Sequence, residues 1–71
     1  MARKVTVVVE SGKDYYSCFM TGADDLKFGL IGDGKTVRAA MEDLLMADKE
    51  MREFYEEEGK EYPDLEFQFV F

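Results

Sequence analysis

Four residues near the middle of the chain match the spacing of a nucleotide-binding phosphate loop. Gly29, Gly34, Lys35 and Thr36 fit the pattern G-x-x-x-x-G-K-[ST], in which backbone N–H groups surround phosphates, lysine reaches them and the hydroxyl binds magnesium. Such a loop needs a buried parallel strand before it. This chain has only 71 residues and no later apolar strand that ends in aspartate. We therefore interpret the glycines as turn residues and Thr36 as a helix cap, and we expect no cofactor.

The other reactive side chains do not form a recognisable catalytic set. The chain has no histidine, so Cys18 and the serines lack the base that usually activates such nucleophiles. A metal site would consist of carboxylates alone, and Asp24 and Asp25 are the closest pair. Adjacent carboxylates in a loop are typical of turns. We therefore expect no catalytic and no metal-binding residues, and we predict that the protein is not an enzyme.

The strands that would position these residues are short and rich in β-branched and aromatic side chains. Such runs predict strands over residues 4–10, 15–20, 26–31 and 65–71. The second run is apolar on both faces, which suggests cover by the helix on one side and by another subunit on the other. Gly32, Asp33 and Gly34 are expected to end the third strand in a turn. The last run alternates, and its expected core residues are Leu65, Phe67, Phe69 and Phe71.

One long helix is predicted over residues 37–58. Thr36 is a suitable N-cap, and Gly59 stands where a left-handed residue commonly follows a helix. Asp48 interrupts the apolar stripe, so we expect the helix to extend beyond the sheet from that point. The expected buried stripe consists of Val37, Ala40, Met41, Leu44, Leu45, Met51 and Tyr55.

The element order β-β-β-α-β predicts an α+β fold. The first three strands are expected to form an antiparallel meander. A right-handed crossover through the helix then places the fourth strand parallel to the first, giving the strand order 3-2-1-4. One helix covers one sheet face, and the other is left to solvent or a second subunit. Residues 1–71 are expected to form one domain, and because the aromatic last strand runs to Phe71, we expect the N-terminal part of a longer protein.

Charge is divided unevenly along the chain. Residues 1–41 have six basic and five acidic side chains, residues 42–71 have three and eleven, and the net charge is -7. An acidic segment repels phosphates, so we expect no direct nucleic-acid binding. Either the acidic half is a solvated surface or it binds a basic partner. No apolar run has the length of a membrane span or signal peptide, and the single cysteine excludes an internal disulfide, so a cytoplasmic protein is expected.

The element order and several local motifs resemble the HicB-like antitoxin domain. The motifs are the opening strand VTVVVE, the hairpin Gly-Lys-Asp-Tyr-Tyr and the turn Gly-Asp-Gly-Lys-Thr-Val. The segment YEEEGKEYPDLEFQFVF is similar to the variant found in Bacteroides-type gut bacteria, in which a helix-turn-helix segment typically follows. Residues 21–26 depart from the family's usual Pro-Asp-Leu-Pro-Gly-Cys run. The family's pattern of glycine, a polar residue, threonine and an alanine-rich helical turn is matched by Gly34, Lys35, Thr36, Ala39 and Ala40.

This resemblance implies a non-catalytic antitoxin module with a partial ribonuclease-H-like fold. Such a module caps a small basic mRNA-cleaving toxin of the HicA type and forms dimers or higher oligomers. DNA would be bound only through a missing C-terminal domain.

Two surfaces are therefore candidates for interaction. The candidates for contact with a basic toxin are Glu53, Glu56, Glu57 and Glu58. The candidates for a subunit interface are Val8, Tyr16 and Met20. The alternative hypothesis is a dimerisation or sensory domain of a transcriptional regulator without a toxin partner. A third hypothesis, a nucleotide-binding protein, depends only on the phosphate-loop match.

Overall fold

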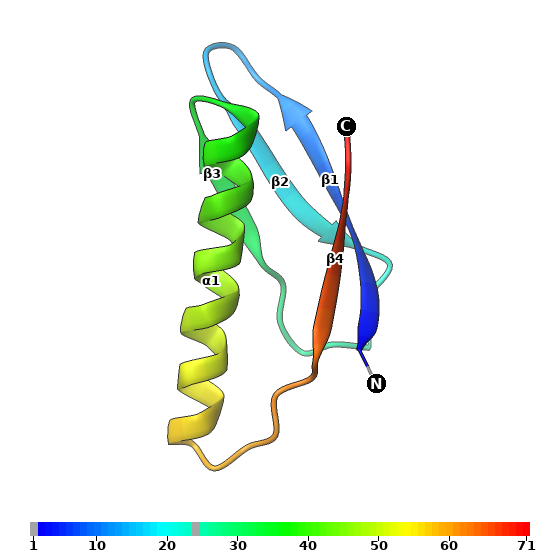
Figure 1. The fold of residues 1–71 in the computed structure, drawn as a ribbon, viewed down its shortest axis with the longest axis vertical. Helices are drawn as coiled ribbons and strands as arrows, with labels where there is room; N and C mark the ends of the chain where they lie inside the picture. Colours follow the sequence, from blue (N-terminus) through cyan, green and yellow to red (C-terminus); the bar gives the residue numbers. More distant parts are fainter. Residues whose placement is uncertain (1, 24) are drawn as a thin grey trace.

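The computed structural model describes residues 2–23 and 25–71 and has the predicted α+β architecture. Its sheet has the strand order β3-β2-β1-β4, with β1 antiparallel to β2 and parallel to β4 (Figure 1). The predicted topology is therefore confirmed. The elements are β1 (Arg3–Ser11), β2 (Tyr16–Thr21), β3 (Ile31–Gly34), α1 (Val37–Glu57) and β4 (Leu65–Val70).

The third strand lies later in the chain than predicted. Strand β3 begins at Ile31 and includes Gly32 and Gly34, where a turn was expected. The turn prediction was wrong because these glycines serve close packing. A Cβ atom at Gly32 would lie 2.3 Å from the carbonyl oxygen of Ala40 and 2.5 Å from the nitrogen of Leu44. Helix α1 therefore rests directly on the backbone of β3.

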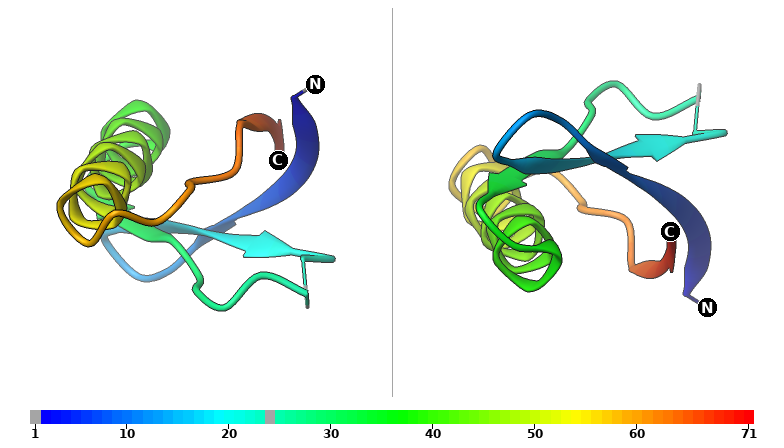
Figure 2. Two further views of the ribbon diagram at one scale, coloured as in Figure 1. Left: turned by 90° about the horizontal axis from the view of Figure 1, so that it is seen from below. Right: turned by 90° about the horizontal axis from the view of Figure 1, so that it is seen from above.

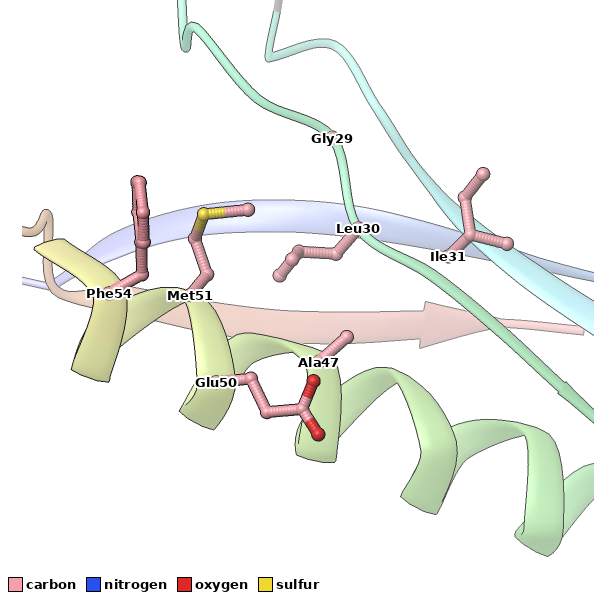
Figure 3. Close-up of a pocket in the computed structure, with 7 residues that line it drawn as sticks. All are labelled: Gly29, Leu30, Ile31, Ala47, Glu50, Met51 and Phe54. Atoms are coloured by element: carbon pink, nitrogen blue, oxygen red, sulfur yellow. The ribbon is translucent and has the colours of Figure 1, made fainter.

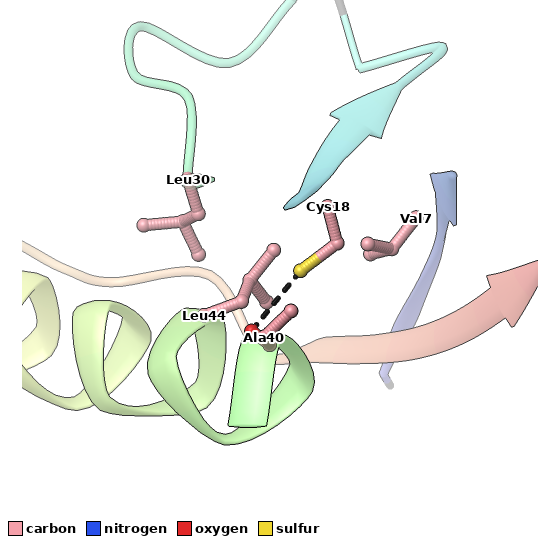
Figure 4. Close-up of a cluster of buried hydrophobic side chains, with 5 residues drawn as sticks. All are labelled: Val7, Cys18, Leu30, Ala40 and Leu44. Atoms are coloured by element: carbon pink, nitrogen blue, oxygen red, sulfur yellow. Dashed lines mark hydrogen bonds between the residues drawn. The ribbon is translucent and has the colours of Figure 1, made fainter. Parts of the chain in front are cut away.

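The core lies between this helix and the covered face of the sheet. Its fully buried members include Val7 of β1, Cys18 of β2, and Ala40 and Leu44 of α1 (Figure 4). The Cys18 thiol donates a hydrogen bond to the carbonyl oxygen of Ala40 at 3.2 Å. Leu30, which precedes β3, completes the cluster. Helix α1 thus covers one face of β2, and within residues 2–23 and 25–71 no second layer covers its other face.

Both ends of α1 are capped as the sequence predicted. The Thr36 hydroxyl accepts a hydrogen bond from the backbone N–H of Ala39 at 3.0 Å, which satisfies one free donor of the first turn. At the other end, Gly59 has a φ of 68° and donates to the carbonyl of Glu56, while Lys60 donates to the carbonyl of Tyr55. This pair of hydrogen bonds is a Schellman motif.

The second half of α1 packs against two connecting segments (Figure 1). Tyr62, in the connection to β4, donates its hydroxyl to Asp48 at 2.6 Å. Phe28, in the connection to β3, stacks on Tyr62 with ring centroids 5.4 Å apart, and Tyr55 contacts both rings edge-on. Asp48 interrupts the apolar stripe because its carboxylate accepts the hydrogen bond from Tyr62 of this aromatic cluster. Leu45 was wrongly assigned to the buried stripe, since it is 45% exposed.

Helix α1 lies at one side of a strongly twisted sheet, against β3 and β2 (Figure 2). Strand β4, next to β1 at the other end of the strand order, lies between β1 and the helix in both views (Figure 2). Leu65 is buried and Phe67 and Phe69 are half-buried, which agrees with the predicted core face. Phe71 was also predicted to face the core, but it is 77% exposed because it follows the last residue paired with β1.

Candidate functional site

The phosphate-loop match does not form a loop in the structure. Ile31–Gly34, which would surround the phosphates, is strand β3, antiparallel to β2. A Cβ at Gly34 would lie 2.6 Å from that of Ala39, so the helix occupies the space beside this glycine. The Thr36 hydroxyl is already engaged with the backbone of the first helical turn. This stretch is therefore a joint between strand and helix, and its glycines and threonine have structural roles.

The carboxylates singled out in the sequence are not gathered into a metal site. Asp24 lies outside the described residues. The Asp25 carboxylate forms a two-pronged ion pair with the guanidinium of Arg3, and the hydrogen bonds from Arg3 lower the pKa of Asp25 to about 2. Across residues 2–23 and 25–71, no cluster of three His, Cys, Asp or Glu side chains is placed to hold a metal ion. Asp25 thus joins the start of β1 to the loop after β2.

Cys18 is fully buried against the helix. Burial raises the pKa of the Cys18 thiol, and the S–H group donates a hydrogen bond to the Ala40 carbonyl. Both effects disfavour the thiolate, which is the reactive form. Cys18 is a core residue in this fold.

An apolar groove lies between α1 and the segment that leads into β3. It has a volume of about 350 Å³, and the side chains of Met51 and Phe54 line the helix side (Figure 3). The Phe54 side chain is 52% exposed, so this large apolar ring is open to solvent, whereas the Ile31 side chain points away from the helix (Figure 3). The complete lining is Gly29, Leu30, Ile31, Ala47, Glu50, Met51 and Phe54. Exposed apolar surface of this kind marks an interaction site more often than scattered single residues do.

Negative charge lines the helix beside this groove. Glu50 is part of the lining, and Glu53 and Glu57 follow it at spacings of three and seven residues, which places all three along one side of α1. Of the other predicted contacts, Glu56 lies farther around the helix and Glu58 is its C-cap residue. All five glutamates are exposed, and the ion pairs of residues 2–23 and 25–71 involve none of them. We call Glu50, Glu53 and Glu57 the acidic flank.

The open face of the sheet has an apolar row that crosses all four strands. The strand register places Ile31 beside Phe19, Phe19 beside Val8, and Val8 beside Val70. Ile31 and Val70 are 64% and 50% exposed. Among the residues that the structure describes, no helix covers this face, since α1 lies against the other one (Figure 2). We call these four residues the open-face row.

The three predicted interface residues do not share this face. Val8 belongs to the open-face row, but Tyr16 and Met20 are half-buried and pack against the core cluster. Side chains alternate along a strand, and Cys18 fixes the covered face of β2, so Tyr16 and Met20 point with it toward α1. The structure therefore separates Val8 from the other two.

The groove and the open-face row were missed by sequence reasoning. The groove needs the segment before β3 to lie against α1, whereas the sequence suggested a strand there. Its signal in the sequence is the spacing of Ala47, Glu50 and Phe54, three and four residues apart along the helix. The row needs the strand register, which hydrophobic alternation alone does not give.

Across the part of the chain that the structure describes, no helix is long and apolar enough to cross a membrane. Searches with models of known families, among curated proteins and among solved structures gave no significant match to this chain.

Proposed function

We propose that this chain is a non-catalytic, HicB-like antitoxin domain that binds and neutralises a small basic mRNA-cleaving toxin of the HicA type and also oligomerises. The observation that carries the proposal is the apolar groove with the acidic flank beside it. Interfaces typically combine an apolar centre with a polar rim, and a negative rim accelerates the approach of a basic partner. Because the toxin's substrate is mRNA, the proposal places the protein in the bacterial cytoplasm.

In this proposal, contact with the groove provides the affinity for the toxin. The acidic flank increases the association rate and the selectivity for a basic partner. Phe54 and Met51 offer the exposed aromatic and flexible apolar surface that commonly anchors a partner. The exposed glutamates of the flank have no competing ion pair to break within residues 2–23 and 25–71. The chain's net charge of -7 adds a long-range attraction for a basic protein.

The test is a binding measurement with the full-length protein and a catalytically inactive form of the small basic toxin encoded beside its gene. Phe54→Ser is expected to accelerate dissociation, with Tyr15→Ser as the matched control because these rings are 52% and 50% exposed. Glu53→Lys is expected to slow association and to reduce its dependence on salt, with Glu10→Lys as the control of equal charge. If Phe54→Ser and Glu53→Lys both bound and neutralised the toxin like their controls, the groove and the acidic flank would be excluded as the toxin site.

The alternative function is a dimerisation or sensory domain of a transcriptional regulator that has no toxin partner. The open-face row favours it, since an apolar row across an uncovered sheet fits a second subunit without requiring a basic protein. The absence of any gene for a small basic protein beside this one would favour the alternative over the antitoxin.

A further inference from the structure

The β3 edge of the sheet is closed at one end and open at the other. At the closed end, the backbone N–H of Asp33 donates to the Asp43 carboxylate of α1 at 2.9 Å, so the helix supplies a partner to the edge strand. One helical turn further along α1, the corresponding residue is Ala47, whose side chain cannot accept a hydrogen bond. Ala47 instead lines the apolar groove, which continues along the segment that leads into β3 (Figure 3).

The backbone of Ile31 forms part of the groove wall. Successive residues of an antiparallel strand direct their N–H and C=O groups to alternate sides. Because the Asp33 N–H points away from β2, the N–H and C=O of Ile31, two residues earlier, also point away from β2. Ile31 lines the groove although its side chain points away from the helix (Figure 3). Among residues 2–23 and 25–71, no side chain and no loop backbone is hydrogen-bonded to Ile31.

Gly29 leaves the same wall of the groove open to close approach. A Cβ atom at Gly29 would have no atom within 4 Å, whereas α1 fills the space beside Gly32 and Gly34. Glycine beside a strand can mark a position where another backbone comes close. The groove volume of about 350 Å³ lies within the range of about 300–1,000 Å³ that is usual for ligand pockets. The groove therefore has room for a short extended segment between β3 and α1.

We propose that the groove binds an extended segment of the basic partner, which joins the sheet as a fifth strand beside β3. The backbone of the segment would pair with the outward N–H and C=O of Ile31, and alternate side chains would enter the groove against Met51 and Phe54. Strand addition of this kind gains affinity from main-chain hydrogen bonds and specificity from pockets for alternate side chains. The inference rests on the proposed function and deepens it by naming the part of the partner that is bound.

The surroundings of the groove define the composition of the segment. Met51 and Phe54 form an apolar wall, so the side chains that enter the groove must be apolar. Side chains on the other face of the segment would lie beside Ile31, which is 64% exposed, and would lengthen the open-face row. Glu50 lines the groove and begins the acidic flank, which attracts lysine and arginine. The site therefore fits a short strand that combines apolar and basic residues.

Amide hydrogen exchange measured by NMR tests this binding mode directly. In the complex with the inactive toxin, the Ile31 amide is expected to exchange at least about tenfold more slowly than in the free chain. Asp33 is the internal control, because its N–H is already bonded to Asp43 and should change far less. A toxin helix lying in the groove would cover Phe54 without slowing exchange at Ile31, and that result would overturn the proposal.

Ile31→Pro and Ile31→Ala provide a matched pair of variants. Both lose the isoleucine side chain, but only proline also lacks the outward N–H. Ile31 is the first residue of an edge strand, a position that accepts proline. Compared at a temperature where circular dichroism shows both to be folded, Ile31→Pro is expected to bind the toxin about 2- to 10-fold more weakly than Ile31→Ala. Equal affinities of the two variants would overturn the proposal.

A synthetic peptide separates this inference from the proposed function. The probe is a short peptide of alternating valine and lysine, and its control has glutamate in place of lysine and should not bind. If the toxin binds but exchange at Ile31 is unchanged, the inference is overturned and the proposed function stands. If the toxin does not bind, the proposed function fails and the peptide decides: slower exchange at Ile31 supports the strand site, and unchanged exchange overturns it.

A second copy of the chain is the competing occupant of the groove. Exchange at Ile31 that slows as the concentration of the chain alone is raised would assign the site to that second copy and overturn the proposal. Exchange that is independent of the chain's concentration, and that slows only when toxin or peptide is added, supports it.

Discussion

The contact between Gly32 and α1 gives the sharpest prediction about stability. In Gly32→Ala, the new methyl group would lie 2.3 Å from the Ala40 carbonyl oxygen and 2.5 Å from the Leu44 nitrogen. Both are backbone atoms of a long helix, so the strain cannot be relieved by rotating one side chain. Overpacking of this kind costs about 1–3 kcal/mol. A domain of this size has a free energy of unfolding of about 4–10 kcal/mol, so one methyl group would remove a large part of it.

Urea denaturation followed by far-ultraviolet circular dichroism measures this loss. A decrease of about 1–3 kcal/mol corresponds to a fall in Tm of roughly 4 to 24 °C for a chain of this length. The matched control is Gly29→Ala, because no atom lies within 4 Å of a Cβ placed there. That control should be neutral or stabilising by about 0.4–1 kcal/mol through the unfolded state. If Gly32→Ala were as stable as Gly29→Ala, the helix could not rest on β3 as described.

Three further changes probe the helix and its neighbours. Thr36→Ala should lower the free energy of unfolding by about 1 kcal/mol, and Thr36→Ser should restore most of it, as measured by urea denaturation. Burial and the hydrogen bond to Asp48 raise the pKa of Tyr62, so the wild-type protein should lose stability as the pH rises above 10, where the unfolded tyrosine ionises first. Tyr62→Phe should be less stable at pH 7 and should lack this part of the alkaline decline; an identical decline in both proteins would contradict the assignment. Cys18 should react with a thiol reagent only through opening of the fold, so a rate that does not fall as stability is raised would contradict its burial.

The topology could be predicted because each of its signals is local and strong. The Thr36 cap, the Gly59 terminus and the alternation in β4 each have one dominant physical cause, and the right-handed crossover then leaves few arrangements. The third strand was misplaced because a glycine in the sequence can indicate either a turn or a site of close packing. Choosing between them at Gly32 requires knowing that α1 lies 2.3 Å from a potential Cβ.

The candidate surfaces were harder to predict than the fold. The acidic helix end was visible in the sequence, but its relation to an apolar groove depends on the irregular segment before β3. Tyr16 and Met20 were assigned to an interface because β2 is apolar on both faces, and only the burial of Cys18 shows which face meets the helix.

The pairing of β1 with β4 has a consequence for how the chain folds. Arg3 and Leu65 are neighbours in the sheet although they lie at opposite ends of the sequence. Contacts between such distant residues require closure of a long loop and slow the folding of small domains. During synthesis, β1, β2, β3 and α1 leave the ribosome before β4 does, so β1 remains an unpaired edge until the last strand arrives. We therefore expect docking of β4 to be the late step of folding, and the nascent chain to be most prone to aggregation just before it.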